Sequence, residues 1–421
     1  MRLRGSKPLL AILGVALLVR IAVMVATPDF VPIFDAGDFH RHAASIADGH
    51  GYPRPQLGTE GPTAFRPPGY PVALAVVQTL GGGLTAERVL GALLGVVTVL
   101  LVYLIAARVW GPRVATVAGW IAAVFPPLAF LSASLLSELL FLPLALAAVL
   151  AVLRYRDDAR LRWAAAAGVL CGLAVLTRTN GLLLVAALAV GVWTGRPLLA
   201  RASLRPPVVL ALAAALTLAP WVVRNTIVFD RFVGLGTGAG YALSGTYSPE
   251  SRARAQHPGQ PFAPNELRSY RRALARRDLD EAELVGLLSD RATRYIRDHP
   301  GYVVETAAWN LLRVFDFERA GPFGTDLQAL ELEALGVGRL DSKVVWLGSL
   351  YLVLALALLG AVAEARGARR APVFVWLAPL LLLLPALAIY GLPRYRAPID
   401  PFLVMLAAVG CVAAWTRLRP S

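Results

Sequence analysis

The chain has 421 residues, of which 57% are hydrophobic and 16% are charged. Because a soluble domain carries about 25% charged residues, this composition excludes an ordinary soluble protein. The net charge of +14 at pH 7 would suit a nucleic-acid partner, but its placement along the chain argues against that class.

Apolar runs of the length that a membrane-crossing helix needs, about 20 residues, recur along the chain. The first follows three basic residues as a signal peptide would, but its length and the internal Arg20 favour an uncleaved crossing. In chain order, the predicted crossings cover residues 8–27, 86–107, 114–131, 136–153, two short spans within 164–195, 206–223, 343–363, 373–390 and 399–416. We therefore expect an all-α polytopic membrane protein with about ten transmembrane helices.

The basic residues lie in alternate loops between these crossings. Six segments hold 17 lysines and arginines against three acids, which accounts for the whole net charge; they are residues 1–7, 108–113, 154–163, 196–205, 364–370 and 417–421. Basic residues accumulate in the cytoplasmic loops of membrane proteins. The pattern predicts a multi-pass protein of the cell membrane with both termini in the cytoplasm, and no nucleic-acid partner.

Three parts of the chain follow from this topology. Residues 1–223 hold seven helices and a first external loop at 28–85, residues 224–342 form an extracytoplasmic loop domain, and residues 343–421 hold the last three helices. The middle part carries 15 arginines against 16 acids and is soluble in character. Its residues 264–300 are expected to be helical. Residues 302–317 have apolar positions at helical spacing, which fits a helix in the membrane interface.

Two carboxylates, Asp35 and Asp38, directly follow the first crossing. Three residues apart, they share one face of a helix. A carboxylate near the membrane surface could take a proton from a hydroxyl acceptor, or it could cap the helix and favour its dipole. Local features leave both interpretations open. His40 and His42 lie in the same segment, but no His, Asp and Glu set has specific metal spacing, so no metal or other cofactor is expected.

Short motifs in chain order resemble the GT-C membrane glycosyltransferases, and within them the family related to protein O-mannosyltransferases and the lipid A aminoarabinose transferase. They are residues 35–43 (DAGDFHRHA) with 48–52 (DGHGY), 66–71 (RPPGYP), 136–138 (LSE), 176–181 (LTRTNG), 220–225 (PWVVRN), 232–241 and 394–401 (RYRAPIDP). The resemblance spans nearly the whole chain. It implies interfacial helices in the first external loop, together with an active site on the outer face.

The resemblance also implies a reaction. A monosaccharide would pass from a polyprenyl-phosphate donor in the bilayer to an external glycan, lipid or protein acceptor that the sequence does not identify. Fixed cations near the leaving phosphate lower the barrier, and arginine offers a fork of donors to phosphate oxygens. Arginines that lie on the predicted external side are candidate donor-binding residues; they are Arg66, Arg178, Arg224, Arg394 and Arg396. Reaching for lipid headgroups, or support of loop structure, would also explain them.

The candidate base is Asp35, with Asp38 as the alternative. Many relatives carry a second carboxylate where this chain has Ala36, and a tyrosine where it has Phe39, so the sequence leaves the base open between the two. The supporting residues implied by the motifs are Tyr70, Glu138 and Tyr395. Glu138 could equally form a simple ion pair with Arg178.

Two other classes compete with a glycosyltransferase. A transporter or flippase of lipid-linked sugars would place polar residues at mid-bilayer and show repeated halves. A non-catalytic scaffold would leave the external acids and arginines without a common purpose. Because the polar residues gather at the outer helix ends and no repeat is visible, the sequence favours the enzyme.

Overall fold

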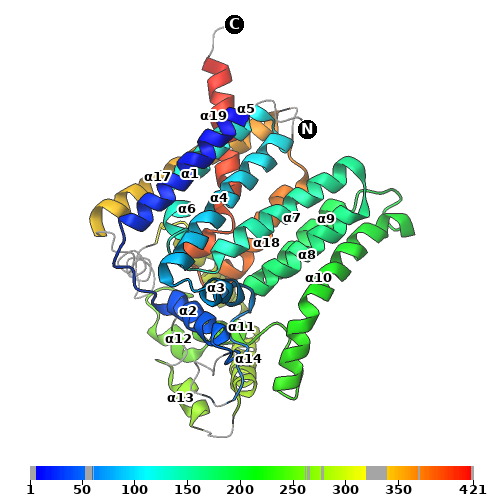
Figure 1. Cartoon of the computed structure of the whole chain (residues 1–421). Helices are drawn as coiled ribbons and strands as arrows, with labels where there is room; N and C mark the ends of the chain where they lie inside the picture. Colours follow the sequence, from blue (N-terminus) through cyan, green and yellow to red (C-terminus); the bar gives the residue numbers. More distant parts are fainter. Residues whose placement is uncertain are drawn as a thin grey trace.

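A computed structural model describes residues 6–52, 59, 61–260, 262, 266–275, 279–318, 339–367 and 370–418. Within these ranges every regular element is helical. Apolar helices form a bundle, and shorter helices gather at one end of it (Figure 1). This arrangement confirms the predicted all-α membrane architecture.

Ten apolar helices occupy the ten predicted crossings. Six have the length and composition to cross a membrane, namely α1 (Ser6–Val25), α4 (Leu84–Val109), α7 (Glu138–Asp158), α10 (Arg201–Val228), α17 (Arg339–Arg366) and α19 (Asp400–Leu418). Four are shorter, namely α5 (Pro112–Val124), α8 (Leu161–Thr177), α9 (Leu182–Val192) and α18 (Val373–Ala388). The polar turn η1 (Thr179–Gly181) separates α8 from α9, as the interruption in the sequence predicted.

The third crossing is shorter than predicted. Helix α5 ends at Val124, and a separate short helix, α6 (Pro126–Leu131), follows it. Phe125 between them is extended because a residue before proline avoids the helical conformation. The break exposes carbonyls at the end of α5, and Arg20 of α1 donates to the oxygen of Ala123 at 3.0 Å. The terminal nitrogens of an arginine inside the bundle thereby meet the negative end of a helix.

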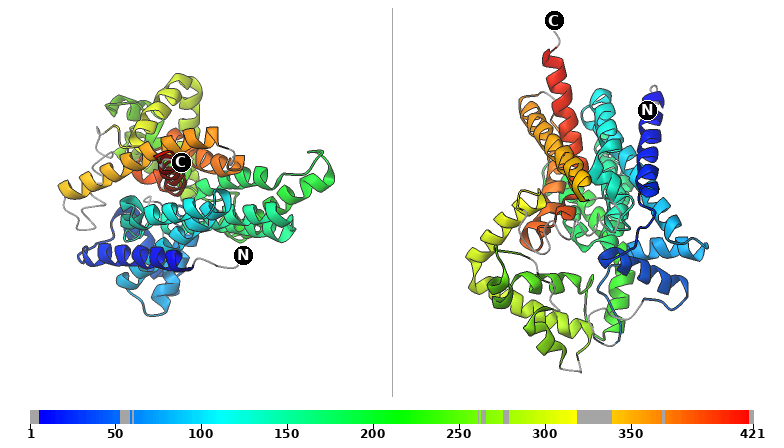
Figure 2. Two further views of the ribbon diagram at one scale, coloured as in Figure 1. Left: turned by 90° about the horizontal axis from the view of Figure 1, so that it is seen from above. Right: turned by 90° about the vertical axis from the view of Figure 1, so that its left-hand side faces the viewer.

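The start of α1 and the end of α19 lie at one end of the bundle, and shorter helices cover the other, which we name the domain end (Figure 1; Figure 2, right). Two helices there come from the first loop, α2 (Phe34–Ala47) and α3 (Gly69–Thr79). The others come from the loop domain, namely α11 (Gly238–Thr246), α12 (Pro249–Arg254), α13 (Arg268–Leu274), α14 (Glu281–Asp298) and α15 (Pro300–Val314). The flanking helices α10 and α17 leave residues 229–338 between them, of which 319–338 lie outside the described residues.

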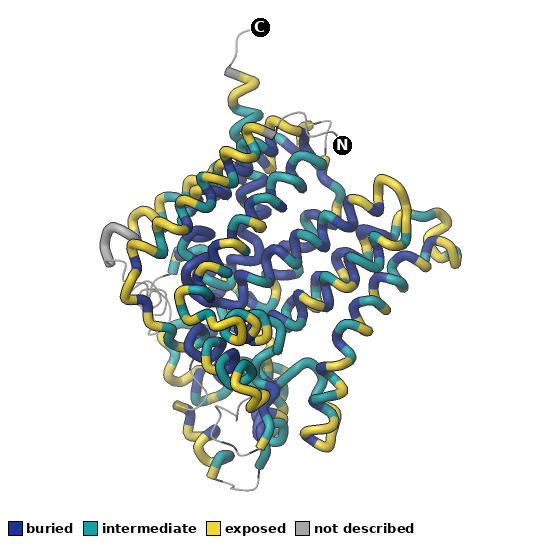
Figure 3. The backbone as a smooth tube through the Cα atoms, viewed as in Figure 1, coloured by how far each residue is buried: buried dark blue, intermediate teal, exposed yellow. Residues whose placement is uncertain are grey.

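The core follows the middle of the bundle (Figure 3). Helix α7 packs against α4 and α8 and is buried along most of its length. Helices α1 and α17 are mostly exposed, and they present large apolar side chains such as Leu18 and Leu358. Surfaces of this kind are costly in water and suit the hydrocarbon of a bilayer.

The loop domain is attached to the end of α18. The last carbonyls of a helix lack partners within the helix. Here Asn310 of α15 donates to the oxygen of Leu387 at 2.9 Å, and Tyr247 and Thr246 donate to Ala388 and Ile389 at 2.5 and 3.1 Å. The short helix η3 (Pro393–Arg396) follows directly. The domain therefore contacts the start of the loop between α18 and α19.

Helix α15 turns three of its polar side chains inward. Thr306, Asn310 and Arg313 are buried, whereas Val304 and Leu311 are exposed. This is the reverse of a helix on a water-soluble domain, and it fits the predicted interfacial helix at 302–317, which stays a prediction.

Candidate active site

Helix α2 presents Asp35 at the domain end without using it as a cap. The N-cap of the helix is Ile33, and no side chain caps the first turn. Phe34, the residue before Asp35, has a positive φ of 46°, which is strained for a bulky residue. Asp35 therefore makes no capping hydrogen bond, although it lies in the first turn where it favours the helix dipole, and its carboxylate is directed to other partners.

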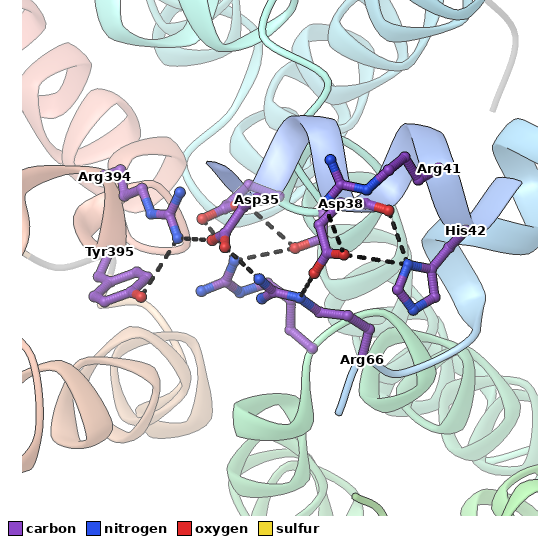
Figure 4. A network of polar contacts seen from close by, with 10 residues as sticks. Asp35, Asp38, Arg41, His42, Arg66, Arg394 and Tyr395 are labelled. Carbon is purple, nitrogen blue, oxygen red and sulfur yellow. Dashed lines mark hydrogen bonds and ion pairs between the residues drawn. The ribbon is translucent and has the colours of Figure 1, made fainter. Parts of the chain in front are cut away.

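Those partners are two arginines from distant parts of the chain. Arg66 Nη2 donates to Asp35 Oδ1, and Arg394 Nη2, which lies 359 residues further along, donates to Asp35 Oδ2 (Figure 4). Arg66 also donates through Nε to Asp38 Oδ2 at 2.6 Å. Asp35, Arg66 and Arg394 are 22%, 20% and 15% exposed, so solvent or substrate can reach the group. The loop between α2 and α3 and the loop between α18 and α19 thus meet at Asp35.

Asp38 is held more deeply than Asp35. Its side chain is 1% exposed, and one oxygen lies 3.3 Å from His42 Nδ1 while the other accepts from Arg66. Arg41 lies on its outer side at 3.6 Å. These contacts suit a residue that orients Arg66, and they leave Asp35 as the more accessible carboxylate.

The charges of the group determine its protonation. Burial alone would raise the pKa of Asp35, but the Arg394 and Arg66 guanidiniums together hold the pKa of this carboxyl well below its usual range. Burial likewise opposes ionisation of Asp38, and the hydrogen bond from His42 and the charge of Arg66 lower its pKa overall. Both carboxylates are ionised, and Asp35 is a weak proton acceptor while both arginines contact it.

A second arginine contacts the same tyrosine ring as Arg394. Arg178 follows the end of α8, and its guanidinium carbon is 5.4 Å from the centre of the Tyr395 ring; that of Arg394 is 5.1 Å from the same ring. Arg178 pairs with the buried Glu138 at 2.6 Å, which is the simple ion pair that the sequence left open. The Tyr395 ring therefore contacts two cations, of which Arg394 pairs with Asp35 and Arg178 with Glu138.

Two predicted phosphate ligands have other partners. Arg224 of α10 donates to the oxygen of Thr63 at 2.7 Å and lies over the Trp221 ring, so it supports the loop before Arg66. Arg396 is fully buried. It pairs with Asp400 at 2.8 Å and donates to the oxygen of Val314 at 2.8 Å. Because its guanidinium is enclosed, we interpret Arg396 as structural support, and its role in donor binding stays a prediction.

Replacing Arg396 with alanine should therefore affect stability more than catalysis. The change leaves Asp400 buried without its partner, which costs about 3–5 kcal/mol in comparable ion pairs. We expect a large drop in the midpoint of thermal unfolding in detergent, with the specific activity of the folded fraction within a few-fold of wild type. Replacing Arg396 and Asp400 together with leucine should recover part of the stability, because the buried Asp316, 3.6 Å from Arg396, still loses that contact. A stable but inactive Arg396→Ala protein would restore the phosphate role.

Tyr70 supports the site by packing. It is almost fully buried in α3, and its ring lies edge-on to Phe39 of α2 with centroids 5.3 Å apart. Because position 39 carries no hydroxyl, this contact between the two interfacial helices is apolar. His40 of α2 lies 2.7 Å from the buried Glu87 of α4, which attaches α2 to the bundle.

Metal dependence stays an open prediction. In the part of the chain that the structure describes, no three His, Cys, Asp or Glu side chains come together as a metal site. His40 and His42 have the partners named above.

Sequence reasoning missed Glu281, the first residue of α14. It is fully buried and contacts Thr63 and Ala64, just before Arg66. Asp280 and Glu283 form a capping box around it, a pattern that indicates only where a helix starts. An acid in the first turn is explained by the helix dipole, so no signal in the sequence marked this one as buried.

Comparisons with known proteins agree with this architecture. Residues 65–223 match the family model of dolichyl-phosphate-mannose-protein mannosyltransferase, a segment that includes Arg66, Glu138 and Arg178. No curated protein matches the chain in sequence.

Solved structures of low sequence identity share the fold. The archaeal oligosaccharyltransferase AglB from Archaeoglobus fulgidus, in complex with an inhibitory peptide and a dolichol-phosphate, has a TM-score of 0.56 at 16% identity over 99% of this chain and 51% of its own. The apo oligosaccharyltransferase from Archaeoglobus fulgidus has a TM-score of 0.54 at 15% identity over 98% and 51%. This chain thus spans about half their length. ArnT from Cupriavidus metallidurans bound to undecaprenyl phosphate, with a TM-score of 0.41 at 15% identity over 98% and 80%, is too distant in structure to add to the argument. The chain therefore has a GT-C-like fold, shared with these archaeal oligosaccharyltransferases, and its residues 65–223 match the family model of dolichyl-phosphate-mannose-protein mannosyltransferase.

Proposed function

We propose that this protein is a membrane glycosyltransferase that moves a monosaccharide from a polyprenyl-phosphate donor to an acceptor outside the cytoplasm. The observation that carries the proposal is the partly exposed Asp35 carboxylate, held between arginines of the first and last loops at one end of the bundle. The family match, and the dolichol-phosphate in the complex of the structurally similar oligosaccharyltransferase, support a lipid-phosphate donor.

Arg394 and Arg178 are the proposed ligands of the donor phosphate. Both are partly exposed, at 15% and 16%, and both lie over the Tyr395 ring. As the glycosidic bond breaks, negative charge grows on the leaving phosphate. Guanidiniums already in place stabilise that charge without reorganisation, and their planar forks match phosphate oxygens.

Asp35 is the proposed base. An acceptor hydroxyl oxygen attacks the anomeric carbon on the side opposite the phosphate, and its proton passes to the Asp35 carboxylate. The bond between the anomeric carbon and the phosphate oxygen breaks, and polyprenyl phosphate leaves with the electron pair. Asp38 is too deeply buried to meet an acceptor, so its proposed part is to orient Arg66.

The donor itself is proposed to prepare the base. While Arg394 and Arg66 both contact Asp35, its pKa is too low for efficient proton transfer. A phosphate that arrives beside Arg178 competes with Asp35 for Arg394. Once Arg394 turns to the phosphate, the pKa of Asp35 rises towards its usual range. The base then becomes effective only when the donor is bound.

The domain end is proposed to face outward, because the basic segments 154–163 and 196–205 lie among the loops at the opposite end. One assay tests both the sugar transfer and the side of the membrane on which it takes place. Purified protein is placed in sealed liposomes with radiolabelled polyprenyl-phosphate sugars, and candidate acceptors are supplied on one side at a time. We expect transfer only with acceptor on the domain side. Movement of intact donor across the bilayer without transfer would instead indicate a flippase.

A further inference from the structure

A buried carboxylate joins the loop domain to the segment that carries Arg66. Glu281 lies 218 residues after Thr63 in the sequence, yet its Oε2 accepts from the Thr63 hydroxyl at 2.7 Å. Its Oε1 accepts from the amide of Ala64 at 2.8 Å and from the Thr237 hydroxyl at 2.7 Å. The side chain is fully buried, so water does not compete for these bonds.

Other contacts hold the same segment. The amide of Thr237 donates to the Ala64 oxygen at 3.2 Å, and Arg224 Nη1 donates to the Thr63 oxygen at 2.7 Å. The Thr63 hydroxyl accepts from the amide of Phe65 at 3.1 Å. Arg66 comes next, and its own carbonyl oxygen accepts from the Tyr52 hydroxyl at 2.5 Å. The backbone that leads into the Asp35 group is thus held at every residue.

We infer that Glu281 is a positioning residue for sugar transfer, acting through Thr63 and Ala64 to hold Arg66 against Asp35 and Asp38. The inference rests on the proposed function. An apolar side chain would fill the same space, and burying a carboxylate is costly unless it is hydrogen-bonded. The carboxylate, unlike an apolar side chain, fixes the direction of three donors: the Thr63 hydroxyl, the Ala64 amide and the Thr237 hydroxyl. It thereby fixes the position of Arg66, which follows two of them in the chain.

The groups around Glu281 shift the pKa of its carboxyl. Burial raises its pKa, and hydrogen bonds led by that from Thr63, with the charge of Arg224, oppose the rise. Tyr52 and Tyr270 also face it, while Asp280 and Glu283 beside it are paired with Arg231. In the free protein the pKa of Asp35 is held far lower. Loss of kcat/KM towards acid pH should therefore follow protonation of Glu281, because kcat/KM reports groups of the free enzyme.

The main test replaces Glu281 with glutamine, measured in the liposome assay. We expect kcat to fall about tenfold or more with little change in the donor KM, because small misplacement of a catalytic group carries losses of this size. The acid limb of kcat/KM should move or vanish. The matched control is Glu283→Gln, in the same turn of α14, which weakens the capping box without touching the loop. It should keep kcat near wild type.

A double substitution separates positioning from stability. In an Arg66→Ala background, Glu281→Gln should cause little further loss of kcat, because the two changes disable one arrangement. If Glu281→Gln fails to fold, Thr63→Val and Thr63→Ser serve instead, with serine keeping the hydroxyl and the activity. Wild-type kcat in Glu281→Gln, or full additivity with Arg66→Ala, would overturn the inference. A wild-type protein inactive with every lipid donor would count against the proposed function instead.

Discussion

Replacing Asp35 with asparagine should abolish sugar transfer while strengthening the binding of polyprenyl phosphate. Asparagine keeps the size of the side chain but removes the proton acceptor, and a general base contributes roughly 10²- to 10⁴-fold in rate. The same change removes the carboxylate that competes for Arg394. Because the coupling between two sites is typically worth 5- to 150-fold in affinity, we expect polyprenyl phosphate to bind about tenfold more tightly.

The direction of the affinity change is the informative result. Equilibrium binding of labelled polyprenyl phosphate to the purified variant measures it apart from chemistry. Asp48→Asn is the matched control, because it removes the same charge from an exposed position just after α2 and should change neither quantity. Unchanged affinity in Asp35→Asn would reject the competition for Arg394. Weaker binding would mean that Asp35 contributes to holding the donor, for example through a cation. Turnover above a tenth of wild type would shift the base to another residue.

The membrane helices were predictable because lipid leaves the backbone few choices. A segment without water must satisfy its own peptide groups, so an apolar run of sufficient length becomes a helix. Even the weakest expectation, two short crossings within 164–195, appears as α8 and α9 around the polar turn η1. The third crossing was too long because Pro126 ends the helix where hydropathy alone continues. Hydropathy depends only on the side chains. The end of this helix depends instead on the backbone N–H that proline lacks and on the clash of its ring with the preceding helical turn.

The candidate site was predictable only in part. Arg66, Arg178 and Arg394 stood out because they break the charge bias of the loops. Arg394 and Arg396 break the same charge bias and lie only two residues apart, yet their side chains point in different directions from η3. A 3₁₀ turn has about three residues, so side chains two apart diverge by roughly 120°. One reaches Asp35 and the other Asp400. Glu281 could not be identified from the sequence, because its burial depends on a loop more than 200 residues away.

Arg394 is the residue whose loss should separate donor binding from proton transfer. Arg394→Ala removes one of the two proposed phosphate cations and should lower turnover about 10²- to 10³-fold, the scale of losing one preorganised donor. It should also weaken the binding of polyprenyl phosphate, opposite in sign to Asp35→Asn. Lysine at this position should rescue only in part, because an ammonium lacks the planar fork.

The pH dependence of the Arg394→Ala variant tests the same contact from the other side. Arg394 is the largest of the charges that lower the pKa of Asp35, so its removal raises that pKa towards the usual range. A base must be ionised to act, and its activity is lost as pH falls through its pKa. In a Glu281→Gln background, where the acid limb assigned to Glu281 is absent, the residual kcat/KM with Arg394→Ala should therefore fall off at higher pH than without it. Arg396→Ala, two residues away and buried with Asp400, should leave the profile of the folded protein unchanged. Equal losses and equal pH profiles in the two arginine variants would show that the last loop acts as a structural unit, and that Arg394 has no separate part in transfer.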